Sequence, residues 1–251
     1  MADLDGVRAL VTGGTSGLGR AMAAALVRSG AAVAVTSRDP GRAERAAAEL
    51  GAGAVGLGLD VRDEASVTAA VDGAYARLGG LDVLVSNAGI GMRTVNPRFL
   101  TDPQPFWEVA ADGFRDVVET KLTGSFLVAR AVVPRMLADG AGRIVAVTMN
   151  EETMVRRGFV PYGPSGAGVE ALTRVMAADL EGTPVTVNLL LPGGATATGM
   201  VPEDVASDAR ANLLDPSVMA DPIVWLASPD AQGVHGHRIV AKDFAAWLAR
   251  R

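Results

Sequence analysis

The sequence contains no cysteine, and this absence excludes several kinds of chemistry at once. A chain without thiols can form no disulfide, no zinc–thiolate site and no cysteine nucleophile. Lysine is almost as scarce, because only Lys121 and Lys242 contribute lysines to the 23 basic residues. We expect no bound metal, and a lysine placed near a candidate site is of special interest.

Long apolar runs are also missing: none approaches the roughly 18 residues that a membrane-spanning helix needs. The N-terminus carries no basic segment followed by an apolar stretch of the kind that directs secretion. The net charge is −5 and the arginines are scattered among acids, so there is no electrostatic basis for binding nucleic acid. We therefore expect a soluble, cytoplasmic protein that acts on a small-molecule substrate, without nucleic acid or membrane.

What the chain does contain is a regular alternation of apolar runs and amphipathic stretches. Its 251 residues are 49% hydrophobic, which is enough for one sizeable core, so we expect a single domain over residues 1–251. Continuous Val, Ile and Leu runs are typical of strands buried on both faces, and helices between them imply parallel crossovers. The expected fold class is α/β, a doubly wound parallel sheet with helices on both faces.

The expected strands are 9–11, 31–36, 54–59, 81–86, 143–148 and 185–191, and the expected helices after the first are 40–50, 64–78, 112–136 and 162–180.

The stretch 7–30 reads as a strand, a glycine turn and the helix that the turn opens. Three glycines follow the first apolar run in the spacing G-x-x-x-G-x-G. Glycine lets a phosphate approach the backbone closely, and the N–H groups at the helix start favour an anion. A pyrophosphate site is therefore expected at this turn, with cofactor contacts from Gly13, Thr15, Ser16, Gly17, Leu18 and Gly19.

Ligands of such a sheet bind beyond the carboxyl ends of its strands, so the residues after each strand form one candidate surface. Polar residues and glycines gather there. Caps and turns alone would also account for many of them, but not for Arg38, which follows the second strand where a dinucleotide ribose would lie. The residues concerned are Ser37, Arg38, Asp60, Asn87, Ala88, Gly89, Thr148, Asn150, Glu151, Glu152, Pro192 and Gly193.

Several motifs in fixed order now identify a relationship. They are TGGTSGLG at 12–19, the pair Leu59 and Asp60, NAG at 87–89, Tyr162 at a helix start, and the pair Pro192 and Gly193. With these the chain resembles the short-chain dehydrogenase/reductase family over nearly its full length. The stretch PYGPSGAGVEALTR is similar to the branch of gluconate dehydrogenases and 3-oxoacyl-carrier-protein reductases.

The resemblance implies a Rossmann fold, a nicotinamide dinucleotide and hydride transfer to or from a carbonyl. It also implies cofactor contacts from Asp60, Val61, Asn87, Ala88, Gly89, Tyr162, Pro192 and Gly193. Family members that prefer NAD tend to place an acidic residue at the end of the second strand, where this chain has Ser37 and then Arg38. A guanidinium offers a fork of donors to a phosphate, so we expect NADP(H) rather than NAD(H); the alternative is that Arg38 pairs with Asp39.

The catalytic residues are where this chain departs from the family, which uses Asn, Ser, Tyr and Lys. Tyr162 is in place as the general acid or base. Met149 stands at the Ser position, Gly166 at the Lys position, and Lys121 at the Asn position. The family Lys lowers the pKa of the tyrosine, and a tyrosine near its reference pKa of about 10 is a poor base at neutral pH.

Two interpretations of Lys121 follow. In the first, Gly166 leaves room for Lys121 to reach across and supply the missing positive charge, so that Tyr162 titrates below its usual pKa. In the second, the site has lost its redox chemistry and Lys121 is an ordinary helix residue. For the missing Ser, the candidate replacements are Thr148, Asn150 and Thr153, of which Asn150 can donate an amide hydrogen to a carbonyl oxygen. Glu152, beside Glu151, could transfer protons if it is buried.

Three functions remain open at this point. The first is an NADP-dependent oxidoreductase for a small carbonyl, imine or alcohol, with Tyr162, Lys121, Asn150, Thr148 and Glu152 as candidate catalytic residues, and this is the function we expect. The second is a non-redox acid/base enzyme, a dehydratase, isomerase or lyase, on the same scaffold. The third is a non-catalytic NADP-binding protein. Fold alone does not decide among them.

The remaining expectations concern assembly and the substrate. Family members are commonly tetramers joined through their long helices and last strand. The Ala-rich helix 112–136 fits such an interface, although the same face could be buried within one chain. We expect a homo-dimer or homo-tetramer, with the substrate pocket lined by residues 91–105 and 195–216.

Overall fold

The computed structural model describes residues 3–202 and 207–251 of the chain. Its centre is a seven-stranded sheet in the order β3-β2-β1-β4-β5-β6-β7, and every pair of neighbouring strands is parallel. The chain moves outward from β1 in one direction and then returns to β4 on its other side, so the switch in strand order lies between β1 and β4. The strands are β1 Arg8–Val11, β2 Ala32–Ser37, β3 Ala54–Gly58, β4 Val83–Ser86, β5 Gly142–Val147, β6 Val185–Leu191 and β7 Arg238–Val240.

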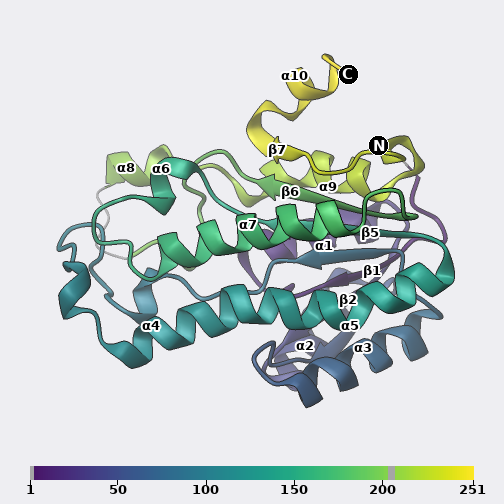
Figure 1. Cartoon of the computed structure of the whole chain (residues 1–251), viewed down its shortest axis with the longest axis horizontal. Helices are drawn as coiled ribbons and strands as arrows, with labels where there is room; N and C mark the ends of the chain where they lie inside the picture. Colours follow the sequence, from purple (N-terminus) through teal and green to yellow (C-terminus); the bar gives the residue numbers. More distant parts are fainter. Residues whose placement is uncertain (1–2, 203–206) are drawn as a thin grey trace.

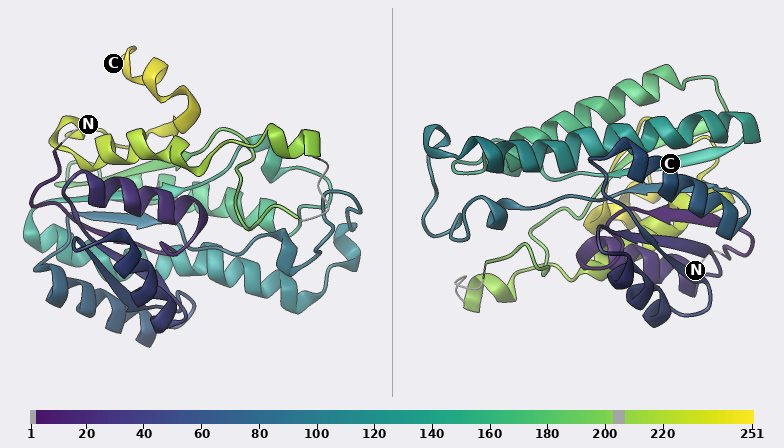
Figure 2. Two further views of the ribbon diagram at one scale, coloured as in Figure 1. Left: turned by 180° about the vertical axis from the view of Figure 1, so that it is seen from behind. Right: turned by 90° about the horizontal axis from the view of Figure 1, so that it is seen from below.

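Helices cover both faces of the sheet. Figure 1 shows α5 and α7 lying side by side in front of it, and the view from behind in Figure 2 shows α1 and α9 over the opposite face. The helices are α1 Gly17–Arg28, α2 Pro40–Leu50, α3 Glu64–Leu78, α4 Ala111–Val118, α5 Gly124–Asp139, α6 Glu151–Met154, α7 Tyr162–Asp179, α8 Ser207–Ala211, α9 Ala220–Ala227 and α10 Phe244–Leu248.

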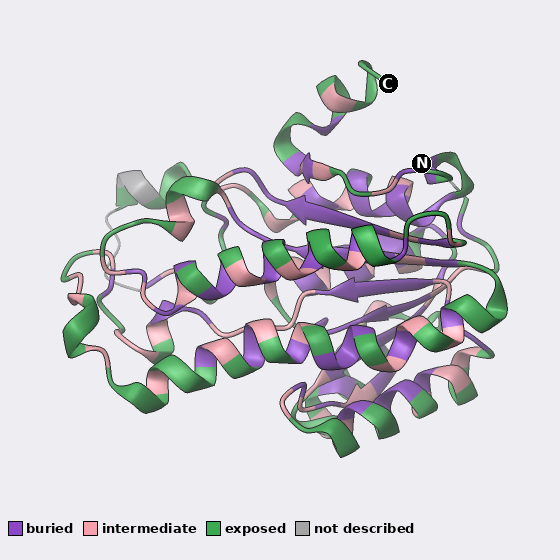
Figure 3. Cartoon of the chain, viewed as in Figure 1, coloured by how far each residue is buried: buried purple, intermediate pink, exposed green. Residues whose placement is uncertain are grey.

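Two apolar clusters hold these layers together, one on each face of the sheet. Met22 and Leu26 of α1 pack with Ile223 of α9 against the strands, while the other cluster joins the sheet to α3 and α5. Burial follows this layering, with buried strands at the centre and exposed side chains on the outer helix surfaces (Figure 3). The sequence-based prediction of a doubly wound α/β sheet is confirmed.

The predicted long helix 112–136 forms with an irregularity inside it. Between α4 and α5 the backbone makes a π-helical turn, η3 Glu119–Thr123, without leaving the helical path. The hydroxyls of Thr120 and Ser125 donate to the carbonyls of Asp116 and Lys121 at 2.7 Å each, and such bonds compete with the helix ladder. Turns of this kind are frequent at functional sites, and this one contains Lys121.

The chain ends in α10, which projects from the body of the molecule (Figure 1). It is held by an aromatic group in which Trp225 of α9 lies 5.7 Å from Phe244 and 5.6 Å from Trp247. Within the described residues, no helix combines the length and apolar character required to cross a membrane.

Candidate active site

The glycine turn after β1 has the backbone geometry expected of a phosphate cradle. Gly13 and Gly17 take φ values of 64° and 54°, which L side chains rarely adopt. A Cβ on Gly13 would stand 3.1 Å from the Cα of Ala88, and one on Gly19 would overlap the side chain of Asn87. The turn is therefore built so closely against the end of β4 that only glycine fits at these points.

Hydrogen bonds fix this turn to the NAG segment. The Oγ1 of Thr12 accepts from the backbone N–H groups of Asn87 and Ala88 at 2.9 and 3.0 Å. The Nδ2 of Asn87 donates in return to the carbonyl oxygens of Thr12 and Gly13. Asn87 thus acts as a structural clamp between two strand ends, on either side of the switch point.

The remaining residues predicted for the pyrophosphate surround the start of α1. Ser16 is the N-cap of α1 and its side chain makes no capping hydrogen bond, while Leu18 packs against the core. Thr198, from the segment after β6, stands 3.3 Å from where a Cβ of Gly17 would lie. Open backbone N–H groups, absent side chains and the helix start fit a dinucleotide pyrophosphate at this turn.

The end of β2 presents an exposed guanidinium, that of Arg38. Arg38 makes no hydrogen bond or ion pair with any residue in the described part of the chain. Asp39, its neighbour, caps α2 and lies 3.9 Å from Arg45 instead, so the alternative pairing of Arg38 with Asp39 is not formed. The Oγ of Ser37 accepts from the backbone of Asp39 at 3.3 Å.

Asp60 does not offer a free carboxylate to a ligand. Arg62 lies 2.7 Å from it and holds its pKa below the ordinary value, chiefly through side-chain hydrogen bonds. Val61 is buried and packs where a Cβ of Gly124 would otherwise be, at the start of α5. These two residues shape the wall of the cleft and tie it to the long helix.

Lys121 and Tyr162 face one another at the centre of this edge. The Nζ of Lys121 lies 5.3 Å from the centroid of the Tyr162 ring, which is the geometry of a cation–π contact. Lys121 is buried, and its stem passes beside Gly89, where a Cβ would stand 3.7 Å from its Cγ. The sequence prediction that Lys121 reaches Tyr162 agrees with this arrangement.

Burial drives both groups toward their uncharged forms. Desolvation lowers the pKa of Lys121 to about 8 and raises the pKa of Tyr162 above its ordinary value. The expectation that Tyr162 titrates below its usual value is therefore wrong for this structure, because loss of water around the phenol outweighs the charge nearby. At neutral pH Tyr162 is a protonated phenol and a proton donor.

The space beside Gly166 is filled, and not by Lys121. A Cβ on Gly166 would stand 2.5 Å from the Cε and 2.9 Å from the Sδ of Met149. The expectation that Gly166 leaves room for Lys121 is corrected accordingly. The two departures from the family pattern, Met149 and Gly166, fit one another as a single packing unit between the end of β5 and helix α7.

Thr148 points into a buried ionic network rather than toward Tyr162. Its hydroxyl lies 3.4 Å from Glu170 of α7, and Glu170 accepts from Arg238 of β7 and from Arg174. Arg238 also donates to the backbone carbonyl of Met149 at 3.1 Å. Thr148 thereby helps to hold β5, α7 and β7 together. This network could not be predicted from the sequence, because its residues lie far apart in the chain.

The other predicted residues of the loop after β5, Asn150, Glu151 and Glu152, are not held by side-chain hydrogen bonds to the described residues. Asn150 begins α6, and its side-chain amide makes no hydrogen bond with the described residues. Glu151 and Glu152 are exposed, so the burial on which a role for Glu152 depends is absent. Asn150 and Thr153 both keep a side-chain donor that makes no hydrogen bond with the described residues.

Two further contacts close the cleft. The Tyr162 hydroxyl lies 3.8 Å from the Sδ of Met200, and Met200 also packs on Gly91. Beneath Pro192, Gly193 has a φ of 92° and is covered by Lys242. Met200 was not predicted from the sequence, since it becomes a neighbour of Tyr162 only through tertiary packing.

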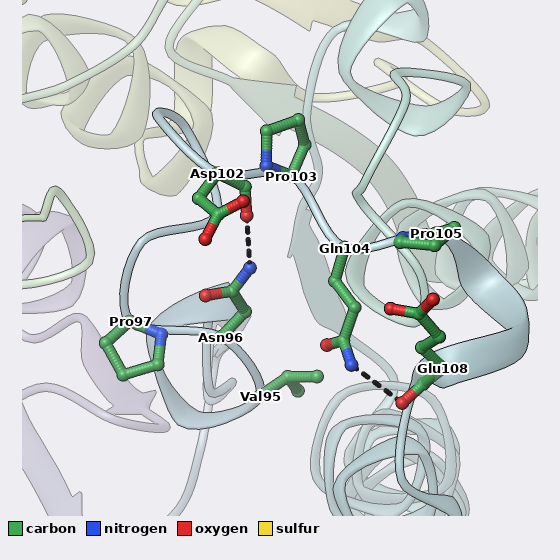
Figure 4. Close-up of a pocket in the computed structure, with 8 residues that line it drawn as sticks. All are labelled: Val95, Asn96, Pro97, Asp102, Pro103, Gln104, Pro105 and Glu108. Atoms are coloured by element: carbon green, nitrogen blue, oxygen red, sulfur yellow. Dashed lines mark hydrogen bonds between the residues drawn. The ribbon is translucent and has the colours of Figure 1, made fainter.

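The predicted substrate segments are placed in part. A pocket of about 340 Å³ lies within the first of them, bounded by the residues labelled in Figure 4, and none of the expected catalytic residues lines it. Gln104 donates to the carbonyl of Glu108 at 2.7 Å across its mouth. Of the second segment, 195–216, residues 203–206 lie outside the described residues.

Comparison with known proteins agrees with this geometry. A family model described as short chain dehydrogenase matches residues 8–209. A 3-oxoacyl-(acyl-carrier-protein) reductase of Vibrio harveyi is 33% identical over 94% of this chain and 96% of its own length. A 2-(S)-hydroxypropyl-CoM dehydrogenase of Xanthobacter autotrophicus is 34% identical over 90% of this chain and 91% of its own.

Among solved structures, a 3-ketoacyl-(acyl-carrier-protein) reductase from Brucella melitensis, complexed with NADH, superposes with a TM-score of 0.84 at 29% identity. The match covers 95% of this chain and 97% of that one.

Proposed function

Because the chain belongs to the short-chain dehydrogenase family and is an oxidoreductase of that family, we propose that it moves hydride between NADP(H) and a small carbonyl, imine or alcohol. The observation that carries the proposal is the pairing of Lys121 with Tyr162 at the edge of the sheet, 5.3 Å from amine to ring centre. No separate observation favours the non-redox or non-catalytic alternatives.

The chain's own residues divide the work. NADP(H), when bound, supplies or accepts the hydride. The glycine turn at 13–19 would hold the pyrophosphate, with Asn87, Ala88 and Gly89 fixing the turn and Pro192 and Gly193 forming the far wall of the cleft. Tyr162 donates its proton to the substrate oxygen as a carbonyl is reduced.

Lys121 supports that proton transfer through its charge. As Tyr162 gives up its proton, negative charge develops on the phenol oxygen, and an ammonium over the ring stabilises it in a site with little water. Asn150 is the candidate donor to the substrate oxygen, in the role that its free side-chain amide allows. Met200 lies beside the phenol, with its Sδ 3.8 Å from the hydroxyl oxygen.

The direct test is turnover of a panel of small aldehydes, ketones and imines, followed by NADPH absorbance. Tyr162→Phe should lower kcat by about 100-fold or more, because it removes a general acid. The matched control is Tyr75→Phe, which changes the other tyrosine of the chain, on α3. Full activity in Tyr162→Phe on a substrate that the wild type turns over would contradict the proposal.

Lys121 is tested by the pH profile of the same reaction. Its ammonium is present below a pH of about 8 and is lost above it, so wild-type kcat should fall as the pH rises through about 8. Lys121→Met should have a lower kcat and lack this falling limb. Identical profiles for the two proteins would remove Lys121 from the proton-transfer step.

The preference for NADP(H) is tested through Arg38. We assign its guanidinium, at the end of β2, to the 2′-phosphate, and losing one charge-assisted contact costs on the order of 1.5 to 3 kcal/mol. Arg38→Ala should therefore weaken NADPH binding by at least about tenfold and leave NADH binding nearly unchanged. Arg45→Ala removes an equivalent exposed charge from α2 and is the control; equal wild-type affinities for NADPH and NADH would refute the assignment.

We also propose that the enzyme works in the cytoplasm as a homo-dimer or homo-tetramer. Support for assembly comes from apolar side chains left exposed on α4, α5 and α7.

A further inference from the structure

We propose that Lys121 is also a nucleophile: its amine condenses reversibly with an aldehyde or ketone that enters the cleft beside Tyr162, forming an imine. This inference does not depend on hydride transfer, and it assigns the chain a covalent carbonyl-binding activity in addition to the proposed oxidoreductase activity.

The first observation is that Lys121 is buried without a hydrogen-bond or ion-pair partner among the described residues. Its side chain retains 8% of its exposure, yet its amine makes no hydrogen bond or ion pair with any residue in the described ranges. Buried amines in proteins are normally paired, because burying an isolated ammonium is costly. An amine left free in this way is available for chemistry.

The second observation is that the amine keeps an opening to solvent. Among the described residues, the hydroxyl of Ser29 is the one buried side-chain polar atom that is sealed without a hydrogen-bond partner. The unpartnered Nζ of Lys121 is therefore not sealed. It lies over the Tyr162 ring, and the Cγ and Cδ of the same side chain pass beside Gly89.

The third observation is the protonation state. Burial lowers the pKa of Lys121 to about 8, so roughly a quarter of the amine is neutral at pH 7.5, against about a thousandth for a lysine at its reference value. Only the neutral amine has the lone pair that attacks a carbonyl carbon. The π-helical turn η3 sets the backbone that directs this side chain into the cleft.

The reaction balances with groups already present. The Nζ lone pair forms a bond to the carbonyl carbon while the C–O π pair moves to oxygen, which takes a proton from Tyr162. The nitrogen then loses a proton, which restores the Tyr162 phenol directly or through solvent, and this gives a neutral carbinolamine. Loss of water from the carbinolamine gives the imine, and hydrolysis reverses each step, so the net change is amine plus carbonyl to imine plus water.

The test traps the imine in the whole, cofactor-free protein. Propanal and sodium cyanoborohydride are added at pH 7.5 for a short, fixed time, and peptide mapping measures the propyl group on each lysine. The chain offers its own control, because Lys242 is the only other lysine and is exposed. The N-terminal amine is quantified separately.

We expect Lys121 to be labelled at least about tenfold faster than Lys242, because burial raises the neutral fraction of the Lys121 amine well above that of a lysine at its reference pKa. In urea-unfolded protein at the same pH the ratio should fall to about one, because the environment that distinguishes the two lysines is gone. Equal labelling in the folded protein, or an unlabelled Lys121, would overturn the proposal without requiring any variant to fold.

A variant then separates this role from the charge role. Lys121→Arg keeps a positive charge but cannot form an imine. It should lose trapping at position 121, whereas Lys242→Arg, which changes the exposed lysine, should leave trapping at position 121 unchanged. Trapping in the wild type with no NADPH oxidation on any substrate would reject the proposed function and leave the imine intact, so the two failures are distinguishable.

Discussion

At the scale of single residues, the buried Lys121 ammonium lowers the stability of the folded protein, and other interactions of the chain must compensate for this loss. Its folded-state pKa of about 8 lies below the value of 10.5 for an unperturbed lysine. Below pH 8 the ammonium is present in both the folded and the unfolded chain, and its burial lowers the free energy of unfolding by roughly 3 kcal/mol. Between pH 8 and 10.5 the unfolded chain binds the proton and the folded chain does not, so this penalty fades as the pH rises.

Lys121→Met should therefore stabilise the protein at pH 7, by at most roughly 3 kcal/mol, while lowering its activity. The gain over wild type should shrink by a similar amount at pH 10.5. Urea unfolding of both proteins at the two pH values measures the difference and cancels all other titrating groups. Lys242→Met, at an exposed position, should show no such pH-dependent gain. If Lys121→Met is less stable than the wild type at pH 7, the buried ammonium does not lower the free energy of unfolding.

At the scale of elements, the sequence predicted what depends on local pattern. Helices α2 Pro40–Leu50 and α3 Glu64–Leu78 and strand β6 Val185–Leu191 form where the apolar periodicity placed them. It missed the π-helical turn inside the helix 112–136, which arises from hydroxyl–carbonyl bonds and has no periodic signature. It also treated Met149 and Gly166 as two separate losses, because only the folded chain brings the loop after β5 against α7.

That contact between elements predicts a coupling. Gly166→Ala adds a methyl group that meets Met149, so its helix-propensity gain of about 1 kcal/mol should be cancelled in the wild-type background. In Met149→Ala the same change should become favourable, giving a coupling free energy of about 1 to 2 kcal/mol in a double-mutant cycle of unfolding. Gly168→Ala, whose Cβ would meet Leu122 instead, is the control and should show no coupling with Met149. If the changes in unfolding free energy at positions 149 and 166 are additive, the Met149 side chain adjusts to the added methyl group without cost.

At the scale of the whole molecule, the sheet gathers the site from distant parts of the chain. The glycine turn, Arg38, the NAG segment, Lys121 and Tyr162 all come to the carboxyl edge, around the switch between β1 and β4. That much follows from the rule that parallel strands end together, so the surface could be predicted from the sequence. The sequence could not predict which of these residues are free for chemistry. Thr148 contacts Glu170 and Asp60 pairs with Arg62, and these side chains meet only after folding.

The outer surface of α4, α5 and α7 leads to the last prediction, which concerns assembly. Phe114, Phe126 and Val175 remain 41%, 45% and 57% exposed on these helices, which lie together on the front of the molecule (Figure 1). Large apolar side chains exposed on neighbouring helices are typical of interaction surfaces, so we expect light scattering to give two or four times the mass of one chain. Phe126→Arg and Val175→Arg should each raise the dissociation constant at least about tenfold, or about 1.4 kcal/mol. Val155→Arg changes a side chain that is 85% exposed elsewhere, at the end of α6, and should leave the mass unchanged. A wild-type protein with the mass of one chain at all concentrations would show that these helices face solvent alone.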